Sequence, residues 1–325
     1  MKLNEHVRGA QFVLLLTPNS DSWKVYRLFK KELCQRALPS QVIKSGTIRK
    51  RQSTGMILSK VVQQMNVKLG GPLWHVEAEG EERPDFEEFF EDPTMILGIH
   101  SYQTAGETWL GLVASLNKAC SQYYSMADAG SSTQTLEELF RNALVAFAHQ
   151  NGSQLPKKIV VYRAFLGLDD WPSAERELKV MKQVLQGAKT RPGYEPEVTF
   201  VAVAKKDDMR IFNLRPDVAN ITNPEPGTIV EFSTVPGHLE SFYAVHHAAV
   251  RGTAVPTHYT ILERPSSMTL DFIERLSYRL CLLYYSANST VRLPAPVMYA
   301  RRLTSFVATL GERPHEELSE TMFYL

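Results

Sequence analysis

The sequence predicts a mixed α/β protein, and two observations support this class. Short apolar runs typical of buried strands alternate along the chain with amphipathic segments of helical spacing. The composition, with 44% hydrophobic and 22% charged residues over 325 positions, is that of a globular protein with a substantial core. The net charge is only +1, so a nucleic-acid partner would have to be bound by a local group of Lys and Arg side chains.

The first part of the chain alternates strand and helix. Residues 11–17 predict a buried strand, and residues 23–34 predict a helix with one apolar face. A turn at Pro39 leads into a second strand over 39–43, and a second helix over 54–65 ends before two glycines. This order is typical of an α/β layer with parallel strands.

Residues 77–93 are rich in acid, and we expect an exposed loop there that connects two α/β units. Beyond it the same alternation continues. We expect strands over 95–99, 110–114, 158–162 and 198–203, and helices over 135–149 and 174–186.

The cysteines and the longest apolar run bear on the compartment. The three cysteines are far apart, so they predict neither a disulfide framework nor a paired zinc site, and this favours a reducing compartment. The apolar run 12–16 is too short to cross a bilayer, and the charged N-terminus lacks the apolar core of a signal peptide. We expect a cytoplasmic or nuclear protein that is not secreted, with no transmembrane segment and no membrane partner.

Four polar side chains near the N-terminus could bind an anion. Tyr26 and Lys30 are four residues apart and share one helix face, Gln41 lies on the next strand, and Lys68 lies where the second helix ends. Hydroxyl, ammonium and amide groups are the donors that a terminal phosphate requires. From the residues alone, a solvated helix face and a Lys that complements a helix dipole remain the alternative interpretation.

The last third of the chain carries strings that resemble the Piwi domain of the Argonaute/Piwi family, nearer the Piwi branch. The strings are 223–228 (NPEPGT), 251–253 (RGT), 256–259 (PTHY), 279–281 (RLC), 292–296 (RLPAP) and 322–325 (MFYL). With 66–71 (NVKLGG) and 159–163 (IVVYR), the resemblance covers essentially the whole chain.

The resemblance implies a domain organisation. It implies a partial Rossmann-like MID unit over 1–76, a connector over 77–93, and a ribonuclease H-like PIWI domain over 94–325. The family's N-terminal and PAZ domains and the first part of MID have no counterpart here, so we expect either a fragment of a longer protein or a natural minimal form.

The resemblance also implies binding residues for a small guide RNA. Tyr26, Lys30, Gln41 and Lys68 match, one by one, the family residues that hold the guide 5′-phosphate. Gln64 and the terminal carboxylate of Leu325 match the ligands of a divalent ion beside that phosphate, which implies Mg²⁺; an apolar tail that only packs is the alternative for Leu325. Tyr284 and Arg292 fall where the family contacts the guide backbone.

Target cleavage in this family uses carboxylates that bind two Mg²⁺ ions. The matching positions here are His100, Ser132 (or its neighbour Ser131), Ala164 and Arg301, and none of these side chains is a carboxylate. The resemblance therefore implies a protein that binds a small, piRNA-like guide RNA and a complementary target RNA. It would act in RNA silencing without slicing, through recruited silencing-factor proteins.

Three other interpretations remain open. The chain could be a protein-interaction or vestigial module that binds no RNA. It could keep residual endoribonuclease activity through relocated ligands such as Asp169 and Asp170. His100 and His258 could bind a transition metal.

Overall fold

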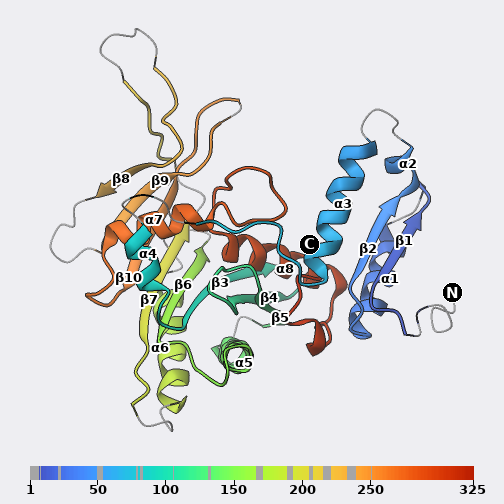
Figure 1. Cartoon of the computed structure of the whole chain (residues 1–325), viewed down its shortest axis with the longest axis horizontal. Coiled ribbons are helices and arrows are strands. Elements are labelled where there is room, and N and C mark those ends of the chain that lie inside the picture. The colour runs from blue at the N-terminus through green and yellow to red at the C-terminus, as the bar shows by residue number, and fades with distance from the viewer. Residues whose placement is uncertain are drawn as a thin grey trace.

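The computed structural model contains a small unit built on a two-stranded sheet and a large unit built on an eight-stranded sheet (Figure 1). It describes residues 7, 9–20, 23–49, 54–77, 80, 83–104, 106–130, 133–165, 171–188, 193–204, 208–214, 221–232, 239–249 and 251–325.

The small unit confirms the expected alternation. Its elements are β1 (Val13–Thr17), α1 (Trp23–Gln35), β2 (Ser40–Lys44), α2 (Ser45–Ile48) and α3 (Thr54–Lys68). Strands β1 and β2 are parallel, with Val13 opposite Ser40. Helix α3 ends at Lys68, because Gly70 follows with a φ of 88° that glycine adopts without strain.

The large sheet has the strand order β5-β4-β3-β6-β7-β10-β9-β8. Its strands are β3 (Thr94–Gln103), β4 (Thr108–Ser115), β5 (Tyr123–Ala129), β6 (Lys158–Phe165), β7 (Glu197–Ala204), β8 (Thr228–Phe232), β9 (Ser241–Val245) and β10 (Thr257–Glu263). The central strands β3, β6 and β7 are parallel, and the strands on either side pair antiparallel. The parallel strands have nearly continuous apolar runs because helices cover both of their faces.

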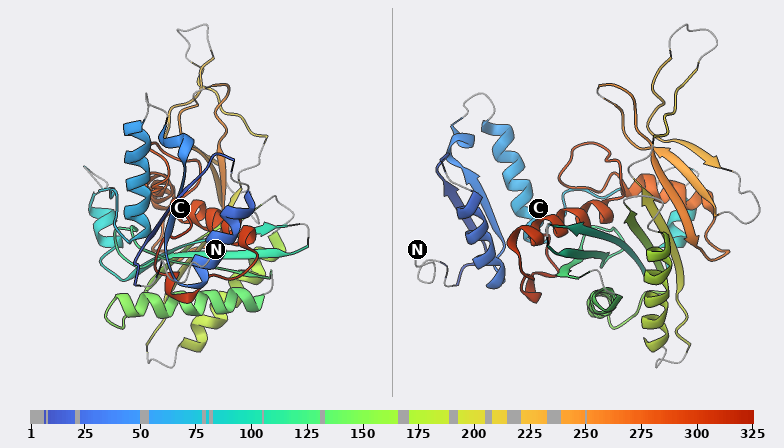
Figure 2. Two further views of the ribbon diagram at one scale, coloured as in Figure 1. Left: turned by 90° about the vertical axis from the view of Figure 1, so that its right-hand side faces the viewer. Right: turned by 180° about the vertical axis from the view of Figure 1, so that it is seen from behind.

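Two helical layers cover the sheet (Figures 1 and 2). Helices α5 (Thr133–Gln150) and α6 (Trp171–Gly187) pack on one face, and α7 (Leu270–Leu280) and α8 (Ala295–Leu310) pack on the other. Helix α8 lies directly on β3 and β4: a Cβ added at Gly98 would lie 2.1 Å from the carbonyl carbon of Pro296, and one at Gly111 would lie 2.4 Å from Thr304 Cγ2. These two glycines therefore fix the position of α8 over the sheet.

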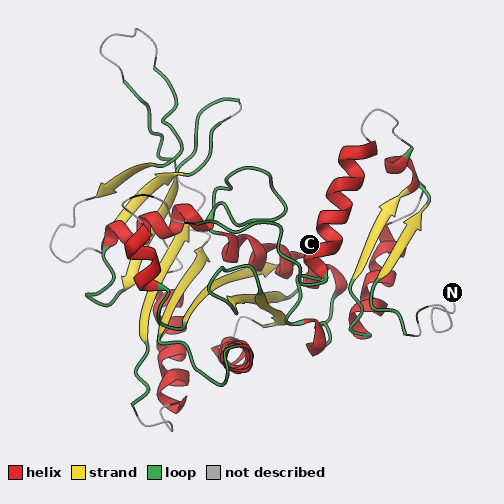
Figure 3. Cartoon of the chain, in the orientation of Figure 1, coloured by secondary structure: helices red, strands yellow, loops and turns green. Residues whose placement is uncertain are grey.

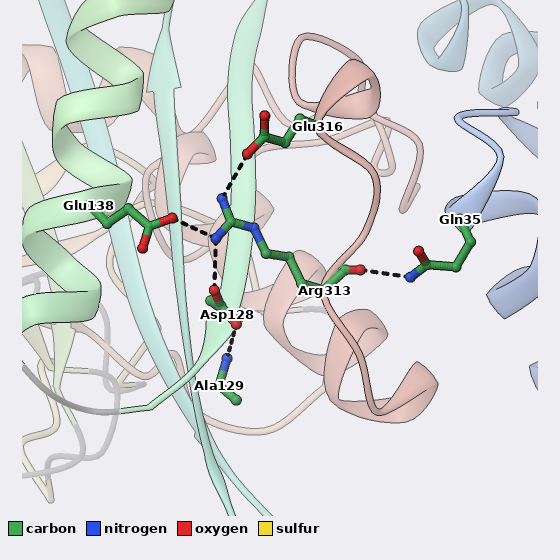
Figure 4. Close-up of polar contacts among 6 residues, drawn as sticks. All are labelled: Gln35, Asp128, Ala129, Glu138, Arg313 and Glu316. Carbon is green, nitrogen blue, oxygen red and sulfur yellow. Dashed lines mark hydrogen bonds and ion pairs between the residues drawn. The ribbon is translucent and has the colours of Figure 1, made fainter.

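The small unit packs against the C-terminal end of the chain. The Gln35 side chain donates a hydrogen bond to the Arg313 carbonyl (2.8 Å), and the His315 amide donates to the Cys34 carbonyl (3.2 Å). Figure 4 shows that the guanidinium of the same Arg313 pairs with Asp128 and Glu138 (2.9 and 2.6 Å). One residue thus joins β5, α5 and the segment that contacts α1. Figure 3 shows the helices and strands that meet at this junction.

The acidic connector is more ordered than expected. Residues 83–89 form helix α4 (Arg83–Phe89), so the prediction of an exposed loop across 77–93 is wrong there. Phe86 and Phe89 are three residues apart and both pack on Phe272 of α7, with ring centroids 4.9 and 4.7 Å away. The many carboxylates around them hid this apolar spacing. The domain limits at 76 and 93 stay predictions.

Candidate nucleic-acid interface

Three elements of the small unit bring two lysines to one backbone carbonyl. Lys30 on α1 donates from Nζ to the Ser40 carbonyl (2.6 Å) and to Ser40 Oγ (2.9 Å). Lys68, the last residue of α3, donates from Nζ to the same carbonyl (3.0 Å) and to Gln41 Oε1 (2.7 Å). The side chains are almost fully buried, with Lys30 3% and Lys68 2% exposed.

Gln41 and Gln64 extend this network. Gln41 Nε2 donates to Gln64 Oε1 (3.1 Å), and Gln64 lies one helical turn before Lys68 on α3. Four of the residues predicted for the phosphate and its metal ion, Lys30, Gln41, Gln64 and Lys68, therefore belong to one connected set of hydrogen bonds.

Tyr26 lies one turn before Lys30 on α1 and is half-buried, with its ring stacked on Trp23. Burial raises the pKa of the Tyr26 phenol, and the nearby Arg302 partly opposes this rise. Tyr26 is thus at the edge of the lysine network.

The Leu325 side chain is buried in the same core cluster as Val67 and Cys34. Figures 1 and 2 show the C-terminus beside the last turn of α3, where Lys68 lies. The Leu325 side chain therefore packs as an apolar tail does, and the C-terminus also lies close to the hydrogen-bond network of Lys68.

The electrostatics of the network are unusual. Burial, together with the positive charge of Arg302, lowers the pKa of Lys30 to about 8. Burial, Lys30 and Arg302 lower that of Lys68 to about 6. The hydrogen-bond acceptors of both ammonium groups are neutral: a carbonyl, a hydroxyl and an amide. Because buried charges without a counter-charge are costly, this site favours an anion.

Sequence reasoning missed Ser40 and Arg302. Arg302 lies on α8, exposed and four residues before Phe306, so the two side chains share a helix face. The ring of Phe306 lies 5.9 Å from Lys30 Nζ, which places this face of α8 next to the lysines. Arg302 thus adds a third positive charge from the large unit. In the sequence, only the four-residue spacing between Arg302 and Phe306 pointed to a shared helix face.

Arg292 lies near His247 and Arg210 in the large unit. Its guanidinium donates from Nη2 to the Val255 carbonyl (3.1 Å), while the buried Arg292 Nε has no hydrogen-bond partner among the residues that the structure describes. Within the described part of the chain, the buried Nδ1 atoms of His246 and His247 also have no hydrogen-bond partner. Burial and Arg292 lower the pKa of His247, and burial and Arg210 lower that of Arg292.

His246 and His247 were missed, although a His pair directly after β9 is visible in the sequence. Tyr284 was predicted to act with Arg292. In the structure it is half-buried and packs on Tyr299, with ring centroids 5.1 Å apart.

Three of the four expected cleavage positions lie near one another, on the central strands β3 and β6 and on the helix α8 that covers them. His100 on β3 and Ala164 on β6 follow the parallel pair Ile99 and Arg163, so they lie on adjacent strands. His100 Nδ1 is 2.8 Å from Thr304 Oγ1 on α8, one turn after Arg301. Ser131 and Ser132, and the alternative ligands Asp169 and Asp170, lie outside the described residues.

The proposed His100–His258 metal pair is wrong. His258 is on β10, and strands β6 and β7 separate β10 from β3. The imidazole of His258 instead stacks on Tyr243, with centroids 4.2 Å apart. Within the described ranges, no group of three or more His, Cys, Asp or Glu side chains is arranged to hold a metal ion.

A family model described as "Piwi domain" matches residues 12–311. The chain belongs to the Argonaute/Piwi family. It is 34% identical over 328 residues to Piwi-like protein 1 of Danio rerio, an alignment that covers 98% of this chain and 36% of that protein. It is 30% identical over 322 residues to human Piwi-like protein 3, covering 96% of this chain and 34% of that protein. The chain therefore spans about a third of the length of these relatives, which support the Piwi branch.

Solved structures of this family have the same fold. The crystal structure of Drosophila Piwi matches with a TM-score of 0.83 and 26% identity, over 99% of this chain and 43% of that one. Kluyveromyces polysporus Argonaute, crystallised with a guide RNA, also matches with a TM-score of 0.83, over 100% of this chain and 43% of that one. At 21% identity, that second likeness shows the fold alone. The mixed α/β, ribonuclease H-like class is confirmed.

Among the described residues, no helix is both long enough and apolar enough to pass through a bilayer.

Proposed function

We propose that this chain binds a small guide RNA through its 5′-phosphate and pairs it with a target RNA, in RNA silencing without slicing. The observation that carries the proposal is the buried lysine pair, whose hydrogen-bond acceptors are all neutral. A phosphate supplies the missing negative charge and raises the pKa of both ammonium groups toward ordinary values.

The hydrogen-bond inventory leaves donors for this phosphate. An ammonium group has three N–H donors, and Lys30 and Lys68 each use two of them on protein acceptors. Gln41 uses one of its two amide hydrogens on Gln64. One donor each from Lys30, Lys68 and Gln41 is left over, and the Tyr26 hydroxyl and the Arg302 guanidinium can add to them. Charge-assisted bonds of this kind contribute about 1.5–3 kcal/mol each.

The donor set also fits the Mg²⁺ ion that the family resemblance implies. Gln64 Oε1, the Leu325 carboxylate and a phosphate oxygen would form an all-oxygen site, which suits this ion. Two lysines in the same network repel a divalent cation, so we propose that it binds only together with the phosphate. It would add charge neutralisation to the phosphate contacts.

The absence of slicing rests on the side chains at the cleavage positions. His100 and Ala164 provide no carboxylate, and Arg301 on α8 carries a fixed positive charge. A guanidinium cannot ligate a cation and repels it. Silencing then depends on target binding and on silencing-factor proteins that join the complex.

Filter binding of one RNA with a 5′-phosphate or a 5′-hydroxyl tests the proposal. The wild type is expected to prefer the phosphate at least tenfold, and Lys30→Ala and Lys68→Ala are expected to lose that preference. Lys179→Ala is the control, because Lys179 is an exposed residue of α6 on the far face of the sheet. Equal affinity of the wild type for both RNAs contradicts the proposal.

A protein-interaction module that binds no RNA is the second candidate. It is favoured by a cavity of ≈ 430 Å³ between α4 and α7, with an apolar floor that includes Phe86, Phe90 and Leu280. Sequencing of RNA recovered with the native protein distinguishes the two candidates. The guide-binding proposal predicts RNA of uniform length with 5′-phosphates, and the second candidate predicts none.

A further inference from the structure

Strand β8 is the last strand at one end of the eight-stranded sheet, and β9 pairs with it on one side (Figure 1). Among the residues that the structure describes, the other edge of β8 has no strand partner, so its backbone N–H and C=O groups can pair with an added strand. Many proteins protect such an edge with Lys or Pro side chains. The sequence of β8, TIVEF, has neither, and its one charged residue is Glu231.

Glu231 points to the face of the sheet that α7 covers. Ile229 of β8 packs against the core cluster that includes Ile273 of α7, and Glu231 lies two residues later on the same strand face. Its cross-strand partner Phe242 belongs to that cluster as well. The Glu231 side chain is exposed, and within the described ranges it makes no hydrogen bond or ion pair.

A second carboxylate, Glu274 of α7, lies close to Glu231. Glu274 is only 4% exposed, and its buried Oε1 has no hydrogen-bond partner in the described part of the chain. Burial, together with the negative charges of Glu231 and Asp271, raises the pKa of Glu274 to about 7. This effect of Glu231 shows that the two carboxylates repel each other. We call Glu231 and Glu274 the acidic site.

The cations of the surrounding elements do not neutralise the acidic site. Arg275 of α7 pairs with Asp271 and with Asp85 of α4 (2.7 and 2.9 Å). His246, which follows β9, is neutral because burial lowers its pKa to about 3. The phenol of Tyr259 on β10 stays protonated, since burial raises its pKa. Among the described residues, the acidic site therefore lacks a counter-charge.

These features define the kind of partner that fits. The described residues hold no group of three or more His, Cys, Asp or Glu side chains suited to a metal ion, so the acidic site favours a longer organic cation. Two carboxylates repel nucleic acid. A second copy of β8 would bring like charges together across the strands. An extended basic segment avoids these problems, because its backbone can pair with the edge and its cation with the carboxylates.

We propose that the free edge of β8 binds an extended, basic segment of a protein partner, which places a Lys or Arg side chain against Glu231 and Glu274. The segment would continue the sheet as a further strand. Backbone hydrogen bonds would provide affinity, and the cation on the α7 face would provide specificity. This inference goes beyond the proposed function and does not depend on RNA binding.

Titration of the isotope-labelled chain with short peptides tests this site. The peptides alternate Val and Thr over about seven residues, enough to span β8, and carry Lys, norleucine or Glu on the face toward α7. We expect the Lys peptide to bind about tenfold more tightly than the norleucine peptide, because a charge-assisted pair is gained. It should shift the amide signals of Thr228–Phe232. A Lys peptide with N-methylated amides on its pairing edge should not bind, since it cannot donate to β8.

Two conservative variants test the carboxylates. Glu231→Gln and Glu274→Gln keep the shapes of the side chains and should each remove most of the preference for Lys over norleucine. In the wild type, binding of the Lys peptide should strengthen as pH rises through 7, because Glu274 ionises there, and Glu274→Gln should lack this change. Glu175→Gln is the control, because Glu175 is an exposed residue of α6 on the other face of the sheet.

Several results would overturn the proposal. These are equal affinity for the Lys and norleucine peptides, no binding of any peptide, and a Lys preference that persists in both Gln variants. Signal shifts that leave out β8 would also overturn it. If the chain alone dimerises and the dimer buries β8, the occupant is a second copy and the proposal is wrong. Because no RNA is present, these results do not depend on whether the chain binds a guide.

Discussion

Lys30 and Lys68 are the residues on which the proposed function depends most. Two ammonium groups buried at one carbonyl are unfavourable for the folded state without an anion, as their lowered pKa values show. A need for a stable core does not explain such a pair. Apolar side chains of similar volume would pack there without the free-energy cost of removing two ammonium groups from water. A bound phosphate would offset this cost, because it supplies negative charge beside both ammonium groups.

The lowered lysine pKa values predict how stability depends on pH. The folded pKa of Lys68, about 6, is below its ordinary value, so between these two values the unfolded chain holds a proton that the folded chain lacks. The free energy of unfolding of the ligand-free protein should therefore rise between about pH 6 and pH 8 by up to ~1.4 kcal/mol per pH unit, and Lys30, with a folded pKa of about 8, adds to the rise above that range. Urea denaturation at several pH values measures this rise.

Lys68→Met is the matched variant for this measurement. It keeps the stem of the side chain and removes the titrating group, so most of the rise should disappear. A rise of the same size in Lys68→Met would show that other groups cause it.

Arg302 should contribute to the preference for a 5′-phosphorylated guide, whereas its neighbour Arg301 should not. Arg302→Ala should reduce the preference for a 5′-phosphate about tenfold, or ~1.4 kcal/mol, because the third positive charge is lost. Arg301→Ala, one residue earlier on the same helix, should keep that preference. Filter binding compares the two, and equal losses in both variants would contradict the assignment of Arg302 alone to the lysine network.

The site could be predicted from sequence only where its residues occupy recognisable positions. The resemblance led to Lys30, Gln41, Gln64 and Lys68, and the structure joins them in one network. Ser40 and Arg302 take part through a backbone carbonyl and through a contact between units. Local patterns do not contain such information.

At the scale of elements, helix α8 determines the interface. It crosses β3 and β4 so closely that glycine is required at two strand positions, and it carries Arg302 toward the lysine network. A small shift of α8 would therefore disturb the network.

Gly98→Ala should destabilise the fold. The new Cβ would lie 2.1 Å from a backbone carbon of α8, which cannot move aside as a side chain can. We expect a loss of about 1–3 kcal/mol in the free energy of unfolding, measured with urea. Gly106→Ala is the control, because nothing lies within 4 Å of its added Cβ. A loss no larger than that of the control would contradict the close approach of α8.

Strong apolar elements were predictable, and weak ones were not. The expected strands over 95–99 and 158–162 lie within β3 and β6, where continuous apolar runs are buried on both faces. Strand β5 was missed because Ser125 and Asp128 interrupt its apolar residues. Helix α4 was missed because only Phe86 and Phe89 mark its buried side.

At the scale of the whole molecule, the guide site depends on how the two units meet. The lysine network belongs to the small unit, whereas Arg302 and the chain end come from the large unit. Contacts of α1 with the C-terminal segment hold the two together, and Arg313 is central to them (Figure 4).

Arg313→Ala should weaken this junction. It leaves Asp128 and Glu138 without their shared partner, and we expect a loss of about 1–2 kcal/mol in unfolding free energy with weaker binding of 5′-phosphorylated RNA. Arg141→Ala is the control, because its pair with Glu137 is an exposed contact within α5 worth about 0.3–0.5 kcal/mol. Equal effects of the two variants on RNA binding would contradict a role for the junction.

The most direct test of 5′-phosphate binding uses a small ligand that carries only one nucleoside and its 5′-phosphate. Calorimetric titration of the purified chain with a nucleoside 5′-monophosphate, and with the same nucleoside lacking the phosphate, isolates the contribution of the lysine network. The account predicts that the monophosphate binds at least tenfold more tightly, and that Lys68→Met abolishes this difference. Equal binding of the two compounds, or an unchanged difference in Lys68→Met, would contradict it.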